Sequence, residues 1–492
     1  MTKNFTENIL ILSNFIPLIG IFLILSLDKR NDEFIKKVAL NFSFAPLVLY
    51  LFIWGGFKKS LGTLQFSSTI LWLPSLNLNL TLGIDGISLF FILLTVLLIP
   101  LCLLASWTGI KENIREYLSA FLLIEFLLIN AFCVLDVLMF YIFFESILIP
   151  MFLIIGVWGS RERKVLASYY FFIYTLLGSV LMLLSIMYIY YQVGTTDYEM
   201  VLAFKFSFIE QKFLWLSFFL AFAAKVPMMP VHLWLPEAHV EAPTAGSIIL
   251  AGVLLKLGTY GFIRFSIPFF PEASFFFTPI VYTISVIGII YASFTAMRQT
   301  DIKRIVAYTS VAHMNVVMLG IFSFNIIGIE GAILQSLSHG CVASALFAII
   351  GVIYERYGTR LVKYYGGLAH TMPLYASTFL FFTMANIGFP GTSNFIGEFL
   401  ILVGSFKVNS SVTFFGATGM ILGGCYALWL LNRTIFGNLR TQYILNTLDL
   451  NKREVAIFLP LTIYTLILGL VPNSCLSTIH MSVNNIVENM YF

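Results

Sequence analysis

The sequence predicts an all-α polytopic membrane protein with about 14 transmembrane helices. Hydrophobic residues make up 59% of its 492 residues and charged residues only 11%, and the mean hydropathy is +0.93. The apolar residues fall into runs of about 20, which is the length of one helical crossing of a bilayer. This is more apolar surface than a water-soluble core could bury, so the expected solvent is lipid.

Each apolar run predicts one crossing, and two of the crossings are expected to be broken. Pro227 and Pro230 should interrupt one of them beside Lys225, because proline removes a backbone donor and clashes with the preceding turn. Residues 60–86 are polar enough to predict an interfacial loop. The expected spans are 8–27, 38–56, 88–107, 117–134, 137–158, 168–191, 213–238 (broken), 244–264, 277–297, 304–323, 328–353, 376–405 (broken), 411–434 and 455–471.

The first span lacks the Arg-rich character of a transit peptide and the small-residue cleavage site of a signal peptide, so we expect a retained membrane helix. The abundance of Phe and Tyr, 50 and 23 residues, is typical of an A·T-rich genome. Both observations favour a multi-pass protein of the mitochondrial inner membrane, with the bacterial plasma membrane as the alternative.

Lys and Arg gather in the loops after the odd-numbered spans. Because basic loops stay on the cytoplasmic or matrix side, both termini are expected on the opposite side, the intermembrane space. This count leaves only Lys225 and Lys256 inside the membrane.

Several function classes lack a sequence signal. The formal net charge of +4 is spread over loops, and no basic tail points to nucleic acid. The five cysteines stand alone, without the spacing of an iron–sulfur or zinc site. No Gly-rich loop for a nucleotide or flavin is present. We therefore expect this chain to bind no cofactor and no metal.

A set of ionisable residues lies within the apolar runs, and a charge at mid-bilayer costs about 2.5–3.5 kcal/mol on insertion scales. Such residues are typical of a proton relay, to which lysine, unlike arginine, is suited. The alternatives are a structural buried ion pair, packed histidines, and a Glu125 that only holds its helix to a neighbour. His232 and His239 are expected at an interface. The candidate site residues are Glu125, Glu145, Lys225, Lys256, His313, His339 and Glu398.

The two halves of the chain repeat one arrangement. In each half, an ionisable residue (Glu145 or His313) lies two helices before a broken helix that carries another (Lys225 or Glu398). Two five-helix units, the second inverted, are a recurring transporter design. The expected divisions are helices 1–3 in residues 1–110, a first repeat in 111–265, a second in 266–436, and a last helix with its tail in 437–492.

Seven segments of the sequence resemble the subunit 4 family of respiratory NADH:ubiquinone oxidoreductase, complex I, in its mitochondrial form. They are LGIDGISLFF (82–91), FFESILIPMF (143–152), KVPMMPVHLWLPEAHVEAPTAGS (225–247), LAGVLLKLGTYG (250–261), QTDIKRIVAYTSVAHMN (299–315), YYGGL (364–368) and PGTSNFIGEF (390–399).

The resemblance implies an antiporter-like subunit of the membrane arm that translocates protons while electrons pass from NADH to ubiquinone. It implies that Glu145 pairs with Lys225 and that Lys256 and His339 match central proton-path residues. Glu398 matches the glutamate that distinguishes this subunit from its lysine-bearing siblings. NADH, flavin, iron–sulfur clusters and ubiquinone would be handled by other subunits. The expected neighbours are the antiporter-like subunits 2 and 5 and membrane lipids.

Two other classes keep the same residues. A subunit of a multi-subunit sodium/proton antiporter would exchange cations without NADH. A membrane scaffold that only anchors redox partners would tolerate neutralisation of Lys256.

Overall fold

The computed structural model describes residues 2–73, 77–440, 442–443 and 448–491, and it is mostly helical. In chain order the first elements are α1 (Thr2–Ser26), α2 (Asp32–Gly56), β1 (Gln65–Leu73), β2 (Leu78–Ile84), α3 (Gly86–Ala105), α4 (Ile114–Cys133), α5 (Val137–Ser146), α6 (Leu148–Trp158), α7 (Lys164–Val193), α8 (Tyr198–Ala203), α9 (Phe208–Lys225) and α10 (Trp234–Glu241).

One continuous helical segment follows, in which π-helical turns alternate with α-helix. It consists of α11 (Thr244–Ile249), η2 (Leu250–Leu254), α12 (Leu255–Gly261), η3 (Phe262–Ser266) and α13 (Ile267–Phe269). The remaining elements are α14 (Pro271–Arg298), α15 (Ile302–Ile321), α16 (Ile326–Tyr357), the short 3₁₀ turn η4 (Val362–Tyr364), α17 (Leu368–Thr371), α18 (Pro373–Ile387), α19 (Ser393–Val408), α20 (Ser410–Thr434), α21 (Lys452–Leu470) and α22 (Asn473–Tyr491).

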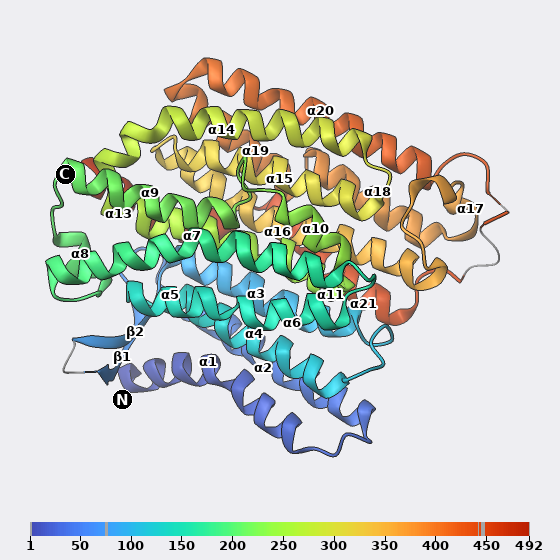
Figure 1. The fold of residues 1–492 in the computed structure, drawn as a ribbon, viewed down its shortest axis with the longest axis horizontal. Coiled ribbons are helices and arrows are strands. Elements are labelled where there is room, and N and C mark those ends of the chain that lie inside the picture. The colour runs from blue at the N-terminus through green and yellow to red at the C-terminus, as the bar shows by residue number, and fades with distance from the viewer. Residues whose placement is uncertain (1, 74–76, 441, 444–447, 492) are drawn as a thin grey trace.

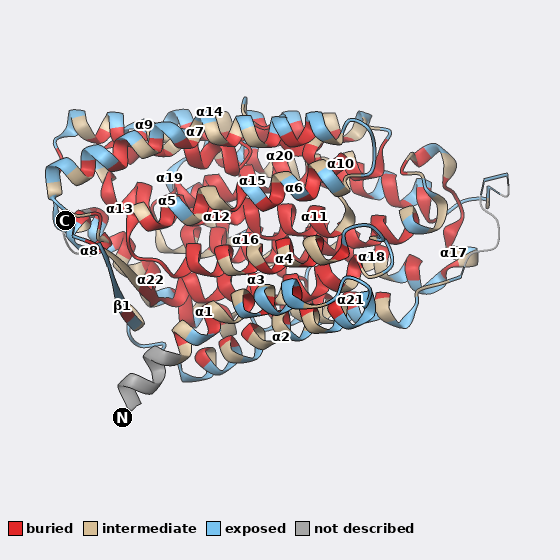
Figure 2. Ribbon diagram, turned by 60° about the horizontal axis from the view of Figure 1, so that its bottom comes forward, coloured by how far each residue is buried: buried red, intermediate tan, exposed pale blue. Residues whose placement is uncertain are grey.

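The long helices lie side by side along the longest dimension of the molecule (Figure 1). Within the described residues, 12 helical segments are long and apolar enough to cross a membrane. α16 lies at the centre and its apolar window is fully buried, whereas α7, α14 and α20 expose large apolar side chains at the periphery (Figure 2). An apolar outer surface around a buried centre is what a bundle surrounded by lipid requires.

Both expected helix breaks are present. α9 ends at Lys225 and α10 begins at Trp234, so the interruption contains Pro227 and Pro230. The indole Nε1 of Trp234 donates to the Ala224 carbonyl oxygen at 2.8 Å, which satisfies an acceptor that the end of α9 leaves free. α18 and α19 are separated by residues 388–392, where Gly388 and Gly391 adopt φ of +81° and +95°, values that favour glycine.

The structure differs from the sequence prediction in two elements. Residues 65–73 and 78–84 pair as the antiparallel strands β1 and β2, with Ser68 opposite Leu82 and Ile70 opposite Leu80, where a loop was expected. The tail contains the amphipathic helix α22. The span expected at 137–158 is present with the same bounds, and its helix is irregular at Ile147, because Pro150 has no N–H to bond the carbonyl of Ser146.

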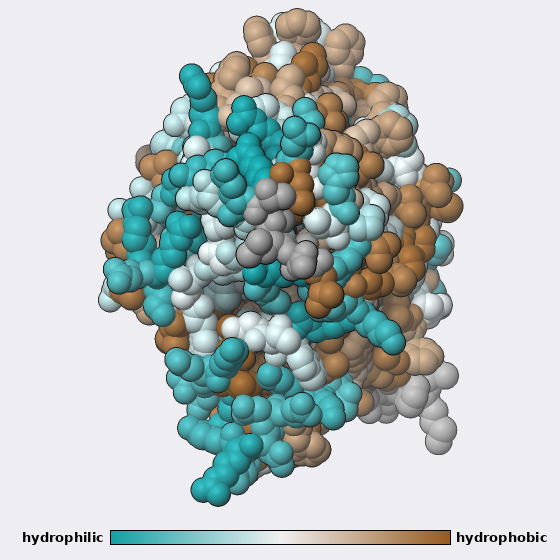
Figure 3. Space-filling model, turned by 90° about the vertical axis from the view of Figure 1, so that its right-hand side faces the viewer, coloured by the Kyte–Doolittle hydropathy of each residue, from teal (hydrophilic) through white to brown (hydrophobic). Residues whose placement is uncertain are grey.

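The two ends of the bundle differ in polarity. At one end the loops are tied together by side chains: the Trp158 indole donates to the Glu112 carbonyl oxygen at 2.9 Å, and Arg356 pairs with Glu454 at 2.8 Å. These loops carry most of the Lys and Arg residues, and hydrophilic side chains gather on this face (Figure 3). We call this face the basic end. The opposite, non-basic end contains the β-hairpin, α8 and α22.

Candidate proton path

The centre of the site is Lys256 on α12, which is fully buried. Its Nζ donates to the carbonyl oxygen of Ala251 at 2.6 Å and lies 3.0 Å from Nδ1 of His339 on α16. Ala251 belongs to the π-helical turn η2, and such turns are frequent at functional sites because they change the register of the backbone hydrogen bonds. The turn thus offers a backbone acceptor to the lysine.

A second group surrounds Glu398 on α19, beside the break before that helix. Its Oε1 lies 3.0 Å from Nδ1 of His313 on α15 and accepts a hydrogen bond from Nε2 of Gln335 on α16 at 3.1 Å. A small pocket of about 20 Å³, lined in part by His313, Glu398 and Tyr426, adjoins the group. This volume suffices for about one water molecule.

The two groups meet through their histidines. The ring centroids of His313 and His339 are 5.6 Å apart, and Nε2 of each ring is buried without a hydrogen-bond partner among the described residues. Buried polar atoms of this kind call for ordered water. The structure therefore brings Lys256, His339, His313 and Glu398 from four elements into one polar line through the apolar bundle.

Lys225 and Glu145 form a third group, on the α5, α7 and α9 side. Lys225 is buried at the end of α9, and its Nζ lies 4.7 Å from the ring centroid of Phe144. Glu145 is half-buried on α5 and interacts electrostatically with Lys225. Within the described residues, no Glu145 oxygen lies within 4.0 Å of this Nζ, which has no hydrogen-bond partner. The Glu145–Lys225 pair that the sequence predicts is therefore not a direct ion pair in this structure, although the two charges interact.

Close packing of α12 on α9 connects this third group with Lys256. A Cβ on Gly258 would lie 2.6 Å from Cγ2 of Val226 and 3.1 Å from Cβ of Lys225. Only glycine permits this approach, which holds the helix of Lys256 against the end of the helix that carries Lys225.

Glu125 stands apart from these groups. It is fully buried on α4, and neither carboxylate oxygen has a hydrogen-bond partner in the described part of the chain. Among these residues, no hydrogen bond or ion pair joins this carboxylate to a neighbouring helix or to the central line.

The structure adds buried ionisable residues to those expected. His239 on α10 is fully buried, stacks on Phe347 at 4.5 Å between ring centroids, and interacts electrostatically with Lys256 and Lys303. Its ring is thus enclosed by the bundle. Arg264, which the count of loop charges placed outside the membrane, is buried within the span Thr244–Phe269 and pairs with Asp85 at 2.9 Å.

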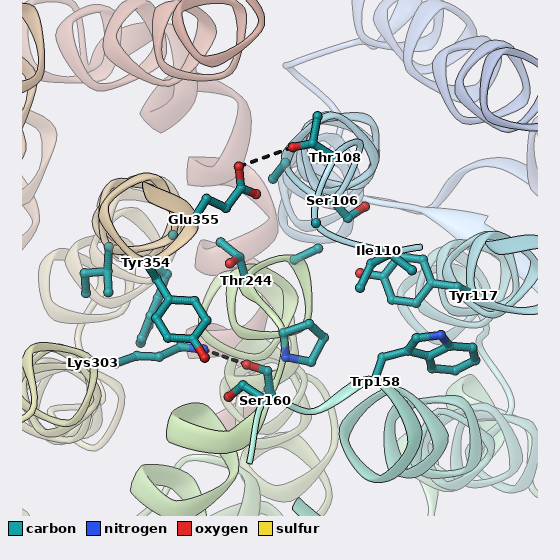
Figure 4. A pocket seen from close by; sticks show the side chains of 18 of the residues that line it. Ser106, Thr108, Ile110, Tyr117, Trp158, Ser160, Thr244, Lys303, Tyr354 and Glu355 are labelled. Carbon is teal, nitrogen blue, oxygen red and sulfur yellow. Dashed lines mark hydrogen bonds between the residues drawn. The ribbon is translucent and has the colours of Figure 1, made fainter. Parts of the chain in front are cut away.

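A pocket of about 490 Å³ lies at the basic end, lined by residues of α3, α11 and α16 and of the adjoining loops (Figure 4). Thr108 Oγ1 donates to Glu355 Oε2 at 3.3 Å on one wall, and Lys303 Nζ donates to the Ala242 carbonyl oxygen at 2.7 Å on the other. Phe347 lines the same pocket, so the stacked His239 lies behind its wall. The pocket thus extends from the basic end as far as Phe347.

No group of three or more His, Cys, Asp or Glu that could hold a metal ion occurs among the residues that the structure describes.

Comparisons with known proteins agree on one family. A family model described as "NADH:quinone oxidoreductase/Mrp antiporter, TM" matches residues 134–423. The chain is 56% identical over 481 residues to the "NADH-ubiquinone oxidoreductase chain 4" of Chondrus crispus, covering 98% of each chain. It is 54% identical over 494 residues to the protein of the same name from Arabidopsis thaliana, covering 100% of both.

Solved structures share the fold. A chain of respiratory complex I from Thermus thermophilus with bound NADH superposes with a TM-score of 0.90 at 29% identity, covering 98% of this chain and 99% of that chain. A chain of the Mrp complex from Dietzia sp. DQ12-45-1b superposes with a TM-score of 0.85 at 20% identity, covering 98% of each. The second likeness concerns the fold alone.

Proposed function

Because this chain belongs to the chain 4 family of NADH:ubiquinone oxidoreductase, the proton-translocating complex I, we propose that the line of buried ionisable residues is its proton path. The observation that carries the proposal is the contact of Lys256 with His339, which leads through His313 to Glu398. These groups can each take up and release a proton, and they lie close enough to exchange protons directly or through one water.

The path begins at the basic end and ends near the break before α19. Water in the 490 Å³ pocket supplies protons past His239 to Lys256. From there the protons pass to His339, His313 and Glu398. Glu145 and Lys225 receive the signal from redox chemistry elsewhere in the complex, since bringing this pair together or apart changes the electrostatic field at Lys256. Moving one charge against 100 mV requires about 2.3 kcal/mol.

The same proposal includes the location, topology and neighbours of the chain. The protein lies in the mitochondrial inner membrane, with its basic end towards the matrix and both termini towards the intermembrane space. The bundle has fourteen crossings arranged as two inverted five-helix repeats, in 111–265 and 266–436. Its neighbours are the antiporter-like subunits 2 and 5, together with lipids. The chain binds no redox cofactor, since NADH, flavin, iron–sulfur clusters and ubiquinone belong to other subunits. The role of Glu125 lies outside this path.

The test is to reconstitute the whole complex carrying Lys225→Ala, Glu145→Gln or Lys256→Arg into proteoliposomes. We expect each variant to assemble and to lose proton uptake driven by NADH oxidation. The arginine variant is the sharpest, because it keeps the positive charge but cannot release its proton. A pH-sensitive dye inside the vesicles reports the uptake, and a native gel reports assembly.

The matched control is Lys205→Ala, which removes an exposed lysine between α8 and α9. Normal quinone reduction and normal proton uptake in Lys225→Ala, Glu145→Gln and Lys256→Arg would refute the proposal. Sodium-dependent proton exchange without NADH would instead favour an antiporter subunit.

A further inference from the structure

A titratable pair outside the central line lies at the non-basic end. His480 Nδ1 on α22 lies 2.6 Å from Glu330 Oε1 on α16. The imidazole side chain is 54% exposed and the carboxylate side chain 13% exposed. The glutamate therefore faces the interior of the bundle, while the histidine faces the aqueous side.

α22 holds this histidine in a fixed position. The helix packs on α16 and α3 through one buried face, made of Cys475, Ile479, Ser482, Val483, Ile486 and Val487. Ser482 Oγ accepts from the Gly86 backbone N–H at 3.1 Å, and Asn485 Nδ2 donates to the Gly62 carbonyl oxygen at 3.0 Å. These contacts anchor α22 at the start of α3 and on the segment before the hairpin.

Polar groups lie between this pair and Lys256, on the face of α16 that α21 and α22 cover. The hydroxyl of Tyr464 on α21 is buried without a hydrogen-bond partner among the described residues. Cys341 on α16 and Cys475 on α22 are also buried, and α21 and α22 both pack on α16. A buried hydroxyl without a partner is a position for an ordered water.

Helix geometry supports this order of groups. Glu330 and Cys341 are eleven residues apart on α16, which is about three turns, so they lie on the same face roughly 16 Å from each other. Asp85 is the other carboxylate near the contact of α22 with α3. It forms an ion pair with Arg264 at 2.9 Å, so it does not compete with Glu330 for a proton.

We propose that Glu330 and His480 form a proton-release pair, which ends a second outlet from Lys256 to the non-basic end along α16, α21 and α22. A proton that leaves Lys256 through water protonates the Glu330 carboxylate, which passes it to Nδ1 of His480. The resulting imidazolium gives its Nε2 proton to bulk water, which leaves the ring protonated at Nδ1, so that one proton enters and one leaves. The exposed ring regains the Nε2–H tautomer by taking up a proton at Nε2 from bulk water and losing the Nδ1 proton to bulk water. This outlet rests on the proposed function, because Lys256 is its source.

The experiment measures NADH-driven proton uptake of the reconstituted whole complex carrying Glu330→Gln, His480→Gln or Tyr464→Phe. We expect uptake rates between those of wild type and Lys256→Gln, with NADH oxidation in the presence of an ionophore unchanged. The double variant Glu330→Gln/Glu398→Gln should match Lys256→Gln, because both outlets are closed. Glu330→Asp should restore uptake, which a purely structural role for the carboxylate does not predict. The control is Glu488→Gln, which changes an exposed carboxylate on α22, the helix that carries His480.

The outcomes distinguish failure of the second outlet from failure of the proposed function. Wild-type uptake in assembled Glu330→Gln and His480→Gln would overturn the outlet, while a loss in Lys256→Gln would leave the proposed function standing. Wild-type uptake in Lys256→Gln would overturn both. If Glu330→Gln does not assemble, His480→Gln decides, because this side chain is more than half exposed.

Discussion

Two hydrogen-bond partners from different elements fix Lys256: a carbonyl oxygen of the preceding π-helical turn and a histidine of α16. A buried ammonium group requires such partners, because an unpaired charge in an apolar bundle is costly. When Lys256 gives up its proton, the neutral amine can still bond to His339. The arrangement therefore serves both protonation states, as a relay requires.

Replacement of Glu398 by glutamine keeps the size and shape of the side chain but removes its titratable carboxylate. The amide keeps an oxygen for Gln335 Nε2 but cannot take up a proton. We expect Glu398→Gln to assemble, to oxidise NADH normally with an ionophore present, and to translocate fewer protons per NADH oxidised. Dye-reported uptake in proteoliposomes measures the ratio. The exposed Glu272→Gln at the start of α14 is the control, and equal ratios in the two variants would exclude Glu398 from the path.

The helix is interrupted between α9 and α10, and local contacts stabilise the interruption. Its prolines stop the helix, and Trp234 reaches back to bond the free carbonyl of Ala224. Lys225 thus ends its helix where three consecutive residues, Ala223, Ala224 and Lys225, are buried. The break gives the lysine a place among aromatic rings without a direct ion pair.

Trp234→Phe tests this break. Phenylalanine keeps an apolar ring but leaves the buried carbonyl of Ala224 without its donor, which costs about 1–3 kcal/mol. We expect a lower temperature for the thermal dissociation of this chain from the purified complex, followed by native gel. Trp429→Phe on the exposed side of α20 serves as the control. An unchanged dissociation temperature for Trp234→Phe would show that water replaces the indole.

The pattern of apolar runs and prolines sufficed to predict the breaks and most helix positions, because both depend on local chemistry. The hairpin and α22 escaped prediction because their alternating and amphipathic patterns do not resemble a run of about 20 apolar residues. Residue types identified the titratable groups, but not which of them meet: the contacts of Lys256 with His339 and of Asp85 with Arg264 join residues far apart in sequence. The burial of Arg264 was not predicted, because a charged residue at the end of an apolar run resembles the first residue of a loop.

Across the bundle, the Asp85–Arg264 pair joins the start of α3 to the π-helical turn η3, with the Tyr198 ring of α8 at 4.7 Å from the guanidinium carbon. Asp85 also caps α3 by accepting from the Ser88 N–H at 2.8 Å. The Asp85–Arg264 pair thus links α3, η3 and α8 at the non-basic end.

Asp85→Asn keeps the cap, because asparagine is an equally good N-cap residue, but leaves Arg264 buried and unpaired. Breaking a buried pair in this way costs about 3–5 kcal/mol. We expect little assembled complex for Asp85→Asn on a native gel. The double variant Asp85→Asn/Arg264→Met should recover assembly, because no lone charge remains. Wild-type amounts of the single variant would show that water solvates the arginine.

The π-helical turns around Lys256 can be counted as insertions. A π-helical turn holds one residue more than an α-helical turn, so η2 and η3 each act as a one-residue insertion that the helix has absorbed without losing its direction. If residues 250–254 formed a regular α-helix with the same number of residues, everything after them would turn by about 100°. Lys256 would then point away from His339, so the function of this helix depends on its irregular residue count as much as on its lysine.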